Sequence, residues 1–421
     1  MRDPVERCIL VAAPRKGSVD ATRLVEHLEE LARLVDTAGG LVVGQVTQQV
    51  ASPNLGTFIG EGKVEELRAA IVAAQATLVI FDEELSPVQG ANLERDLKIR
   101  VMDRAEIILD IFSTRARSHE AKLQVELAQL EYLLPRLTRM WTHLSRIRGG
   151  IGLRGPGETQ LETDRRMIRK KIQSLRGKLR EVERHRATLR QGRQPMLGVA
   201  LVGYTNAGKS SVLQALSGEH EILVEDRLFA TLDTLTREVD VGEGVRVRLT
   251  DTVGFIRKLP HHLVASFRAT LEEAREADLL LHVVDAAHPE AEDHIEVVES
   301  VLGELEMSAT PVRLVFNKMD LVSEPEAFAA RAQALHPTAL LVNTTRTDGL
   351  EPLKTALREE SARLRPPVLI RVALEDGAGL ARLYRQGEVI RCDQVDGDYA
   401  VTVRLEPWQV TQWRESGGRV E

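Results

Sequence analysis

The sequence predicts an α/β multidomain protein, with an N-terminal parallel α/β domain, an antiparallel helical hairpin, a second α/β domain and a small C-terminal α+β module. Short apolar runs alternate with stretches of helical periodicity before residue 112 and again after residue 196, which predicts the two α/β domains. Between them, a basic segment carries a heptad pattern instead. The expected domain ranges are 1–112, 113–195, 196–366 and 367–421.

The first domain is expected to contain a mostly parallel sheet covered by helices, because strands and helices alternate along it. The expected strands are Ile9–Ala13, Leu41–Val46, Leu78–Phe81 and Ile99–Met102, and the expected helices are Asp20–Thr37, Lys63–Ala74 and Pro87–Leu97. Gly60-Glu-Gly62-Lys63 precedes one helix and invites comparison with a phosphate-binding loop. A simple loop-to-helix turn is the plainer interpretation, and ATP binding is the alternative.

The second segment is predicted to form two paired helices. Apolar residues recur at alternating spacings of four and three along Leu123–Leu144, and a second apolar stripe follows Ile168–Leu189. Pro135 lies inside the first stripe, where it should kink the helix or free a carbonyl. The joining loop, residues 146–160, contains five glycines, one proline and three arginines.

Charge is distributed unevenly along the chain. Segment 113–195 holds 20 Lys and Arg against 8 Asp and Glu, a net charge of +12; the whole chain carries −7, so the remainder carries −19. An acidic body with one basic segment is typical of a protein that binds a polyanion through an arm. From charge alone, a solvated helical face is the simpler alternative.

Composition excludes several classes of protein. Hydrophobic residues make up 43% and charged residues 28%, which excludes a wholly disordered chain, and no stretch approaches the roughly 18 apolar residues of a membrane span. The two cysteines, Cys8 and Cys392, favour a reducing compartment. A cytoplasmic location is therefore expected, with loose membrane association as an alternative. Aromatic residues make up only 4%, which disfavours base stacking as the main binding device, and no DNA partner is expected.

A phosphate-binding loop opens the second α/β domain. Gly203-Tyr-Thr-Asn-Ala-Gly208-Lys209-Ser210 follows an apolar run and precedes a helical pattern, so G-x-x-x-x-G-K-[ST] occurs in its required context. Its N–H groups and the helix dipole are expected to hold phosphates, Lys209 to reach the β- and γ-phosphates, and Ser210 to ligate Mg²⁺. Asn206 is a candidate ligand for K⁺, with a loop hydrogen bond as the alternative.

Two later motifs predict that the nucleotide is GTP. Asp251-Thr-Val-Gly254 follows an apolar run, so Asp251 can hold the Mg²⁺ shell and the Gly254 N–H can sense the γ-phosphate. In Asn317-Lys318-Met319-Asp320, the final carboxylate can accept two hydrogen bonds from guanine, and adenine lacks that donor pair. Together these motifs predict a Ras-like P-loop G domain that hydrolyses GTP to GDP and phosphate.

The loop between these motifs is expected to act as a switch. Phe229–Thr234 contains several threonines that could complete the Mg²⁺ and γ-phosphate contacts, which are lost on hydrolysis. Phe255 stands where Ras-like GTPases have the glutamine that orients the attacking water. Because phenylalanine cannot orient water by hydrogen bonding, slow intrinsic turnover, stimulated by a partner, is expected.

The motif set resembles the Obg/Era-like group of prokaryotic GTPases and, more specifically, the HflX family. The HflX resemblance rests on GGIGLRGPGETQLETDRR (149–166), DRAEIILDIF (103–112), KLQVELAQLEYLLPRL (122–137), PNLGTFIGEGKVEEL (53–67), LFATLD and DTVGFIRKLP, and it covers nearly the whole chain. It implies that Thr231 is the switch threonine that ligates Mg²⁺, and that a segment at Asn343 supports guanine.

The expected site residues follow from the motifs and the resemblance together. The catalytic groups are Lys209, Thr231 and Gly254, and the magnesium ligands are Ser210, Thr231 and Asp251. The nucleotide-binding residues are Gly203, Tyr204, Thr205, Asn206, Ala207, Gly208, Lys209, Ser210, Ser211, Phe229, Ala230, Thr231, Leu232, Asp233, Asp251, Thr252, Val253, Gly254, Asn317, Lys318, Met319, Asp320, Asn343, Thr344 and Thr345.

The resemblance also implies a ribosome factor that binds the large ribosomal subunit and its RNA and dissociates stalled or idle ribosomes, notably under stress. The residues support this independently, because a flexible, arginine-bearing glycine loop on a basic hairpin suits a narrow RNA cavity. A monomer is expected, because the two apolar stripes pair with each other. The expected RNA contacts are Arg146, Arg148, Gly149, Gly150, Arg154 and Gly155.

The chain departs from the family pattern at three places. Thr234 replaces a proline, Asn343-Thr344 replaces a Ser-Ala pair, and Arg148 stands where a third consecutive glycine is common. Two alternative functions stay open at this point. One is a nucleotide-gated binding protein for another RNA or a protein complex, and the other is an ATP-dependent RNA remodeller, although no helicase motif set is present.

Overall fold

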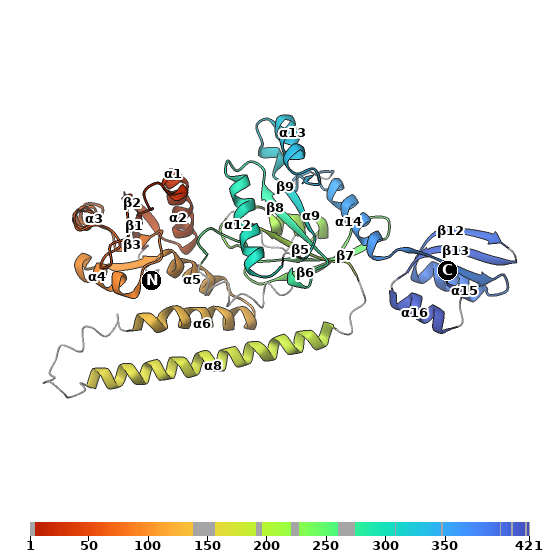
Figure 1. Ribbon diagram of the computed structural model, residues 1–421, viewed down its shortest axis with the longest axis horizontal. Helices are drawn as coiled ribbons and strands as arrows, with labels where there is room; N and C mark the ends of the chain where they lie inside the picture. The colour runs from red at the N-terminus through yellow and green to blue at the C-terminus, as the bar shows by residue number, and fades with distance from the viewer. Residues whose placement is uncertain are drawn as a thin grey trace.

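The structure is a computed structural model, in which two α/β sheets lie side by side, a pair of helices runs beneath them, and a small antiparallel module lies at one end (Figure 1). Among the described residues, no helix is both long and apolar enough to cross a membrane. The described residues are 5–137, 156–190, 196–219, 227–259, 274–307, 309–346, 348–395, 397–405, 407–416 and 419–420.

The N-terminal domain is a four-stranded parallel sheet in the order β2-β1-β3-β4. Its strands are β1 (Arg7–Ala12), β2 (Leu41–Thr47), β3 (Leu78–Phe81) and β4 (Arg100–Asp103), within two residues of the predicted ranges. Its helices are α1 (Val19–Thr22), α2 (Leu24–Ala38), α3 (Glu61–Ala74), α4 (Pro87–Leu97) and α5 (Arg104–Arg115).

Alternate residues of β1 fill two separate cores. Ile9 and Val11 lie in the core formed with α3 and α4, whereas Leu10 lies in the core formed with α2 and α5. Helix α5 was not among the predicted elements; Asp103 caps its N-terminus by accepting from Glu106 N–H. The turn at Gly60 is a loop-to-helix turn in which Gln48 Oε1 accepts the Gly60 N–H at 3.0 Å.

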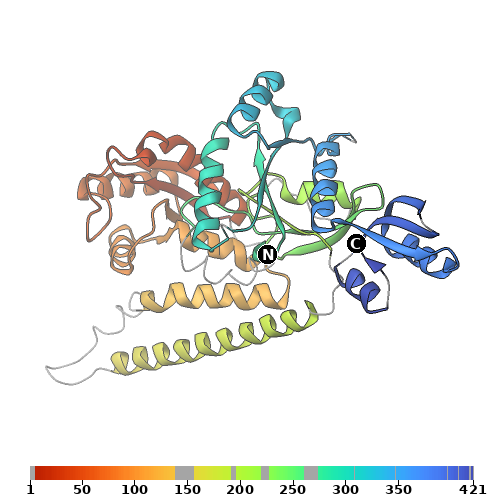
Figure 2. The same cartoon turned by 45° about the vertical axis from the view of Figure 1, so that its right-hand side comes forward.

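The helical arm consists of α6 (His119–Leu133), a 3-10 turn η1 (Leu134–Arg136) and α8 (Pro156–Arg190). The α-helix gives way to η1 at Pro135, as predicted from the missing N–H of proline. Helices α6 and α8 lie side by side and run in opposite directions in both views (Figures 1 and 2). Their shared apolar seam contains Leu123, Leu127, Ile172, Leu175 and Leu179.

Helix α6 also has a second buried face. Val125, Ala128 and Tyr132 lie in the core of the N-terminal domain, and Tyr132 OH donates to Asp103 Oδ1 at 3.0 Å. The heptad pattern therefore predicted the pairing with α8 but not the docking of α6 on the domain. The predicted RNA-contact residues, Arg146 to Gly155, lie outside the described residues.

The G domain is a six-stranded sheet in the order β10-β9-β8-β5-β7-β6, antiparallel only between β6 and β7. Its strands are β5 (Gly198–Gly203), β6 (Leu235–Asp240), β7 (Arg246–Asp251), β8 (Leu279–Asp285), β9 (Val312–Asn317) and β10 (Leu340–Leu341). Its helical segments are α9 (Lys209–Ser217), α12 (Ala291–Glu304), η2 (Met319–Leu321), α13 (Pro325–Leu335) and α14 (Glu351–Leu364).

The C-terminal module is a separate antiparallel sheet in the order β12-β13-β11-β14. Its own apolar core includes Ile370, Leu383, Val401 and Trp413. The elements are β11 (Pro367–Ala373), α15 (Gly377–Gln386), β12 (Glu388–Val395), β13 (Asp398–Arg404), α16 (Pro407–Glu415) and β14 (Arg419–Val420).

Candidate functional site

The predicted motifs meet at one edge of the G-domain sheet. Strands β10, β9, β8, β5 and β7 are neighbours in the sheet and run parallel to one another. Their carboxyl ends therefore lie at the same edge. The phosphate-binding loop follows β5, Asp251 ends β7, Asn317 ends β9 and Asn343 follows β10. Ligands of open α/β sheets bind at this edge.

The phosphate-binding loop requires glycine at two positions. Gly203 and Gly208 have φ angles of +150° and +92°, which residues with a Cβ rarely adopt. A Cβ on Gly208 would also lie 2.2 Å from Asn317 Nδ2, and one on Gly203 would lie 2.2 Å from the Val283 carbonyl oxygen. The loop is thus packed closely against β8 and β9, and α9 begins directly after it.

The Lys209 ammonium is held inside this loop. Its Nζ donates to the carbonyl oxygens of Gly203 at 3.1 Å and Tyr204 at 2.9 Å. Burial lowers the pKa of Lys209 to about 8, while the nearby Asp251 carboxylate acts in the opposite direction. A polyphosphate in the loop would add further negative charge beside this buried ammonium and would favour its charged form.

The three predicted magnesium ligands are in contact with one another. Ser210 Oγ lies 2.7 Å from Thr231 Oγ1 and donates to Asp251 Oδ2 at 2.6 Å. The other carboxylate oxygen, Asp251 Oδ1, is buried without a hydrogen-bond partner among the described residues. Burial raises the pKa of Asp251, against the effect of Lys209. Two hydroxyls and a carboxylate are hard oxygen donors, so this set fits Mg²⁺.

A cavity of about 50 Å³ lies between the phosphate-binding loop and the switch loop. Arg227, an exposed cation just before the predicted switch segment, was not predicted to line it. Asn206 lines it with φ +62°, and its binding of K⁺ stays a prediction. The lining residues are Thr205, Asn206, Gly208, Lys209, Ser210, Ser211, Arg227, Phe229, Ala230, Thr231, Thr252 and Gly254.

The Phe255 side chain lies in the apolar core, only 2% exposed. Its N–H donates to the Gly203 carbonyl at 3.1 Å, and its carbonyl accepts from the Thr205 N–H at 2.7 Å. A Cβ on Gly254 would lie 2.8 Å from Thr205 Cα and 3.0 Å from Lys209 Nζ, so the loop needs glycine there too. At position 255, therefore, the backbone contacts the phosphate-binding loop and no polar side chain is present.

The guanine motif is tied to the phosphate-binding loop. Asn317 is fully buried, and its Nδ2 donates to the Ala207 carbonyl at 3.1 Å. Lys318 has φ +62°, and its Nζ lies 2.7 Å from Asp285 Oδ2. Asp320 lies exposed in η2, where its carboxylate is open to a base.

The segment that replaces the family Ser-Ala pair forms an ordered turn. Asn343 Oδ1 accepts from Thr345 N–H at 2.8 Å and from Thr345 Oγ1 at 2.7 Å. A Cβ on Gly349 would lie 2.1 Å from the Asn343 carbonyl, so the two strands of this turn approach closely. Thr344, the next residue after Asn343, is partly buried. The turn therefore keeps its backbone beside the carboxyl end of β9.

Several predicted site residues direct their side chains elsewhere. Thr252 Oγ1 donates to the Leu201 carbonyl, and the Asp233 carboxylate accepts from the backbone of Arg117 and Ser118 at the start of the arm. For these residues, only the backbone is available to a nucleotide. Such residues include Tyr204, Leu232, Asp233, Thr252, Val253 and Met319; Leu232, Val253 and also Phe229 lie in the apolar core that contains residues of α2 and α5, and Met319 packs against another core.

The segment after Phe255 docks on the N-terminal domain, a contact that sequence patterns did not reveal. Lys258 Nζ lies 2.6 Å from Asp82 Oδ2, and Arg104 pairs with Asp82 Oδ1 at 2.7 Å. Burial raises the pKa of Asp82, and Lys258 lowers it. Arg104 also pairs with Glu30, whose carboxylate accepts from Tyr204 OH of the phosphate-binding loop. The adjacent acids after β3 and bases after Phe255 were the available signal.

Comparisons with known proteins show the family of the chain. Three family descriptions match: "GTP-binding GTPase N-terminal" at residues 25–113, "GTP-binding GTPase Middle Region" at 115–193 and "50S ribosome-binding GTPase" at 198–318. The GTPase HflX of Escherichia coli K12 is 43% identical over 392 residues, covering 93% of this chain and 91% of that protein. The chain belongs to the HflX family of GTPases.

The chain is also similar to a second HflX relative and to a solved structure. The GTPase HflX of Magnetococcus marinus is 44% identical over 409 residues, covering 96% of this chain and 93% of that protein. A crystal structure of SsGBP with GDP is 24% identical, covers 86% of this chain and 99% of that one, and has a TM-score of 0.49. As a member of the HflX family with a P-loop G domain, the chain binds guanine nucleotide and is a GTPase.

Proposed function

We propose that the chain is a GTP-gated ribosome factor, which binds the large ribosomal subunit through its basic helical arm and dissociates stalled or idle ribosomes. The family description "50S ribosome-binding GTPase" for residues 198–318 supports the choice of partner. The charge of the arm supports binding to RNA, because phosphate contacts dominate such affinity.

The observation that carries the proposal is a direct link between the switch loop and the arm. The Asp233 carboxylate accepts from Arg117 N–H at 2.9 Å, from Ser118 N–H at 3.2 Å and from Ser118 Oγ. Ser118 also caps α6 by accepting from Ala121 N–H at 3.0 Å. A movement of the switch loop that displaces Asp233 would therefore break its hydrogen bonds to Arg117 and Ser118 at the start of the arm.

A second contact joins the switch loop to α5, the helix that precedes the arm. Phe229 of the switch loop lies edge-on to Phe112 of α5, with ring centroids 4.7 Å apart. Phe229 has φ +55°, a conformation that costs a residue with a Cβ and that surrounding packing must hold. A change in this loop on hydrolysis would alter its packing on α5 and, through it, the base of the arm.

The arm presents cations to solvent on α8. Lys171 and Arg176 pair with Glu126 and Glu131 of α6, which fixes their side chains beside the neighbouring helix. Further cations of α8 are exposed and can reach the phosphates of folded RNA. These exposed residues are Arg166, Arg169, Lys170, Lys178 and Arg180.

Hydrolysis supplies the release step in this proposal. Lys209 would hold the β- and γ-phosphates, and Thr231 would keep the switch loop closed on the γ-phosphate side. When bound, Mg²⁺ held by Ser210, Thr231 and Asp251 would offset the charge of the transferred phosphoryl group. Loss of the γ-phosphate would release Thr231 and let the switch loop change conformation. Asp233 would then lose its hydrogen bonds to the start of the arm.

Sedimentation of intact ribosomes tests the proposal. Ribosomes incubated with the protein and GTP should separate into subunits on a sucrose gradient, and those incubated with protein and GDP should not. An unchanged profile of intact ribosomes with GTP would contradict the dissociation function. Binding to the intact particle without separation would favour a nucleotide-gated binding protein instead.

A further inference from the structure

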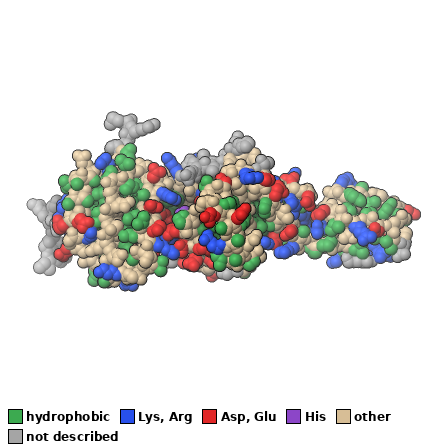
Figure 3. Space-filling view, turned by 90° about the horizontal axis from the view of Figure 1, so that it is seen from above, with side chains coloured by type: hydrophobic (Ala, Val, Ile, Leu, Met, Phe, Trp, Pro, Cys, Tyr) green, Lys and Arg blue, Asp and Glu red, His purple; other side chains and the backbone are tan. Residues whose placement is uncertain are grey.

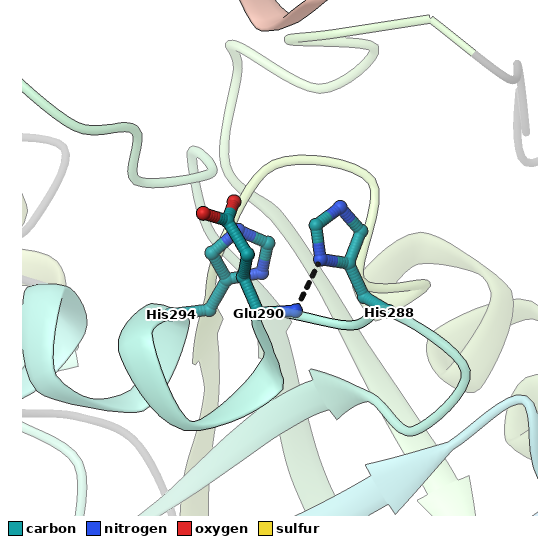
Figure 4. Close-up of side chains that lie close together, drawn as sticks. All are labelled: His288, Glu290 and His294. Carbon is teal, nitrogen blue, oxygen red and sulfur yellow. Dashed lines mark hydrogen bonds between the residues drawn. The ribbon is translucent and has the colours of Figure 1, made fainter. Parts of the chain in front are cut away.

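A cluster of metal-ligating side chains lies outside the nucleotide site, where β8 leads into α12. One ligand atom from each of His288, Glu290 and His294 lies within 4.8 Å of the others (Figure 4). The three residues come from one short segment, so local backbone geometry fixes their spacing. The mechanism proposed above uses none of them.

The backbone brings these side chains to one side of the turn. Ala291 N–H donates to the His288 carbonyl at 3.2 Å, and His294 N–H donates to the Glu290 carbonyl at 3.0 Å. Glu290 and His294 are therefore one helical turn apart and project from the same face. The Glu290 N–H donates to His288 Nδ1 at 3.2 Å, which fixes the imidazole beside the Glu290 backbone (Figure 4).

His294 is buried between neighbouring rings. Its side chain is 7% exposed, and no hydrogen bond to its ring nitrogens is found among the described residues. One face of the ring stacks on Tyr204 at 3.8 Å, and the His288 ring lies 4.4 Å away. The two imidazole rings therefore lie next to each other within the cluster. Neutral imidazole is the form that binds metal ions.

The cluster lines a cavity that a cation can enter. This cavity, of about 640 Å³, lies between α2 of the N-terminal domain and the G domain. Its wall carries six carboxylates against three arginines, so its potential favours positive charge. Acidic and basic side chains are interspersed on the surface above the boundary between the two domains (Figure 3). The six acids are Glu26, Glu29, Glu30, Asp36, Asp285 and Glu290.

We propose that His288, Glu290 and His294 form a binding site for a divalent metal ion such as Zn²⁺ or Co²⁺. Two imidazoles and one carboxylate are a donor set for such ions, whereas Mg²⁺ prefers oxygen ligands alone. Tetrahedral ligand atoms about 2.1 Å from an ion lie roughly 3.4 Å apart, so separations of up to 4.8 Å in the cluster must shorten by up to about 1.4 Å. The His288 side chain is only partly buried, which leaves its ring free to make that adjustment.

Arg257 is the group with which the ion would compete. Its NH1 lies 3.4 Å from Glu290 Oε1, and its Nε lies 3.9 Å from Glu30 Oε2. When Glu290 turns to the ion, Arg257 keeps Glu30 as a partner, so no buried guanidinium is left unpaired. The His294 ring stacks on the ring of Tyr204, which belongs to the phosphate-binding loop. A bound ion would therefore lie close to that loop.

Titration of the full-length, chelator-treated protein with Co²⁺ and then Zn²⁺ tests this site. The wild type should give the intense visible ligand-field bands of a four- or five-coordinate Co²⁺ site, and one equivalent of Zn²⁺ should remove them. His294→Phe keeps the stack on Tyr204 but removes the nitrogen ligand, and His288→Ala changes a partly exposed side chain. Each variant should weaken Zn²⁺ binding by about 100-fold.

His336→Phe is the matched control, because His336 pairs with Glu292 at 3.2 Å on the same domain but lies outside the cluster. It should bind Co²⁺ and Zn²⁺ as the wild type does. Thermal unfolding of every variant establishes that it is folded, and His288→Ala carries the test if His294→Phe is not. Absence of the bands in the wild type would overturn the proposal, as would wild-type Zn²⁺ affinity in the two cluster variants.

Discussion

Replacing Asp233 with asparagine tests whether the switch loop holds the base of the arm. The carboxylate accepts three hydrogen bonds from Arg117 and Ser118, at positions that solvent reaches. Solvent exposure puts each bond at the low end of the range, about 0.5–1 kcal/mol, so the three together contribute about 2 kcal/mol. The amide oxygen of asparagine is uncharged and accepts weaker hydrogen bonds than the carboxylate does. The population with the arm base released should therefore rise by up to about 30-fold.

Hydrogen exchange of the backbone amides at the start of α6 measures this release. In the variant, exchange at Arg117 and Ser118 should accelerate with a GTP analogue bound and resemble that of the wild type with GDP. Asp240→Asn is the control, because Asp240 caps a local turn by accepting from Gly242 N–H at 2.8 Å and does not touch the arm. Wild-type exchange rates in Asp233→Asn would refute the proposed coupling.

Three further predictions concern the site and its supports. Gly208→Ala should weaken GDP binding by about 100-fold in calorimetry, because φ +92° strains alanine and its Cβ overlaps Asn317; Gly218→Ala, with φ +70° and no atom within 4 Å, should not, and equal affinities would argue against the geometry. Phe255→Gln should lower the free energy of unfolding by about 1–3 kcal/mol without raising turnover, since it buries an amide; faster hydrolysis in single-turnover assays would contradict this. Burial and nearby Arg257 lower the pKa of His27 to about 4, so the unfolded state takes up the proton first and stability falls as pH drops from 6.5 towards 4; His27→Gln should reduce the loss at pH 5 by about 2 kcal/mol in denaturant titrations, and an unchanged pH dependence would disprove it.

The relative positions of the nucleotide-binding motifs could be predicted from the sequence because each motif is local. Each motif directly follows an apolar strand, and parallel strands bring their carboxyl ends to one edge, so Ser210, Asp251 and Asn317 had to lie near each other. The change from α-helix to 3-10 turn at Pro135 followed from the backbone chemistry of proline in the same way.

The contacts between parts of the chain could not be predicted, because they join residues far apart in sequence. Asp82 and Lys258 are separated by 176 positions, and Asp233 and Ser118 by 115. Neither residue type nor periodicity indicates which distant charge will meet a buried carboxylate. Asp233 shows the consequence: a motif placed it beside the nucleotide, whereas its side chain is committed to the arm.

The measurement that tests the central proposal most directly is binding of the protein to isolated large ribosomal subunits as a function of salt. With a non-hydrolysable GTP analogue the wild type should bind, and a variant with serine at Arg146, Arg148 and Arg154 should bind more weakly, with a log–log salt slope smaller by about 3. Its GDP affinity should equal that of the wild type. Equal subunit affinity and equal salt slope for the two proteins, or equal wild-type binding with GDP, would contradict a GTP-gated arm.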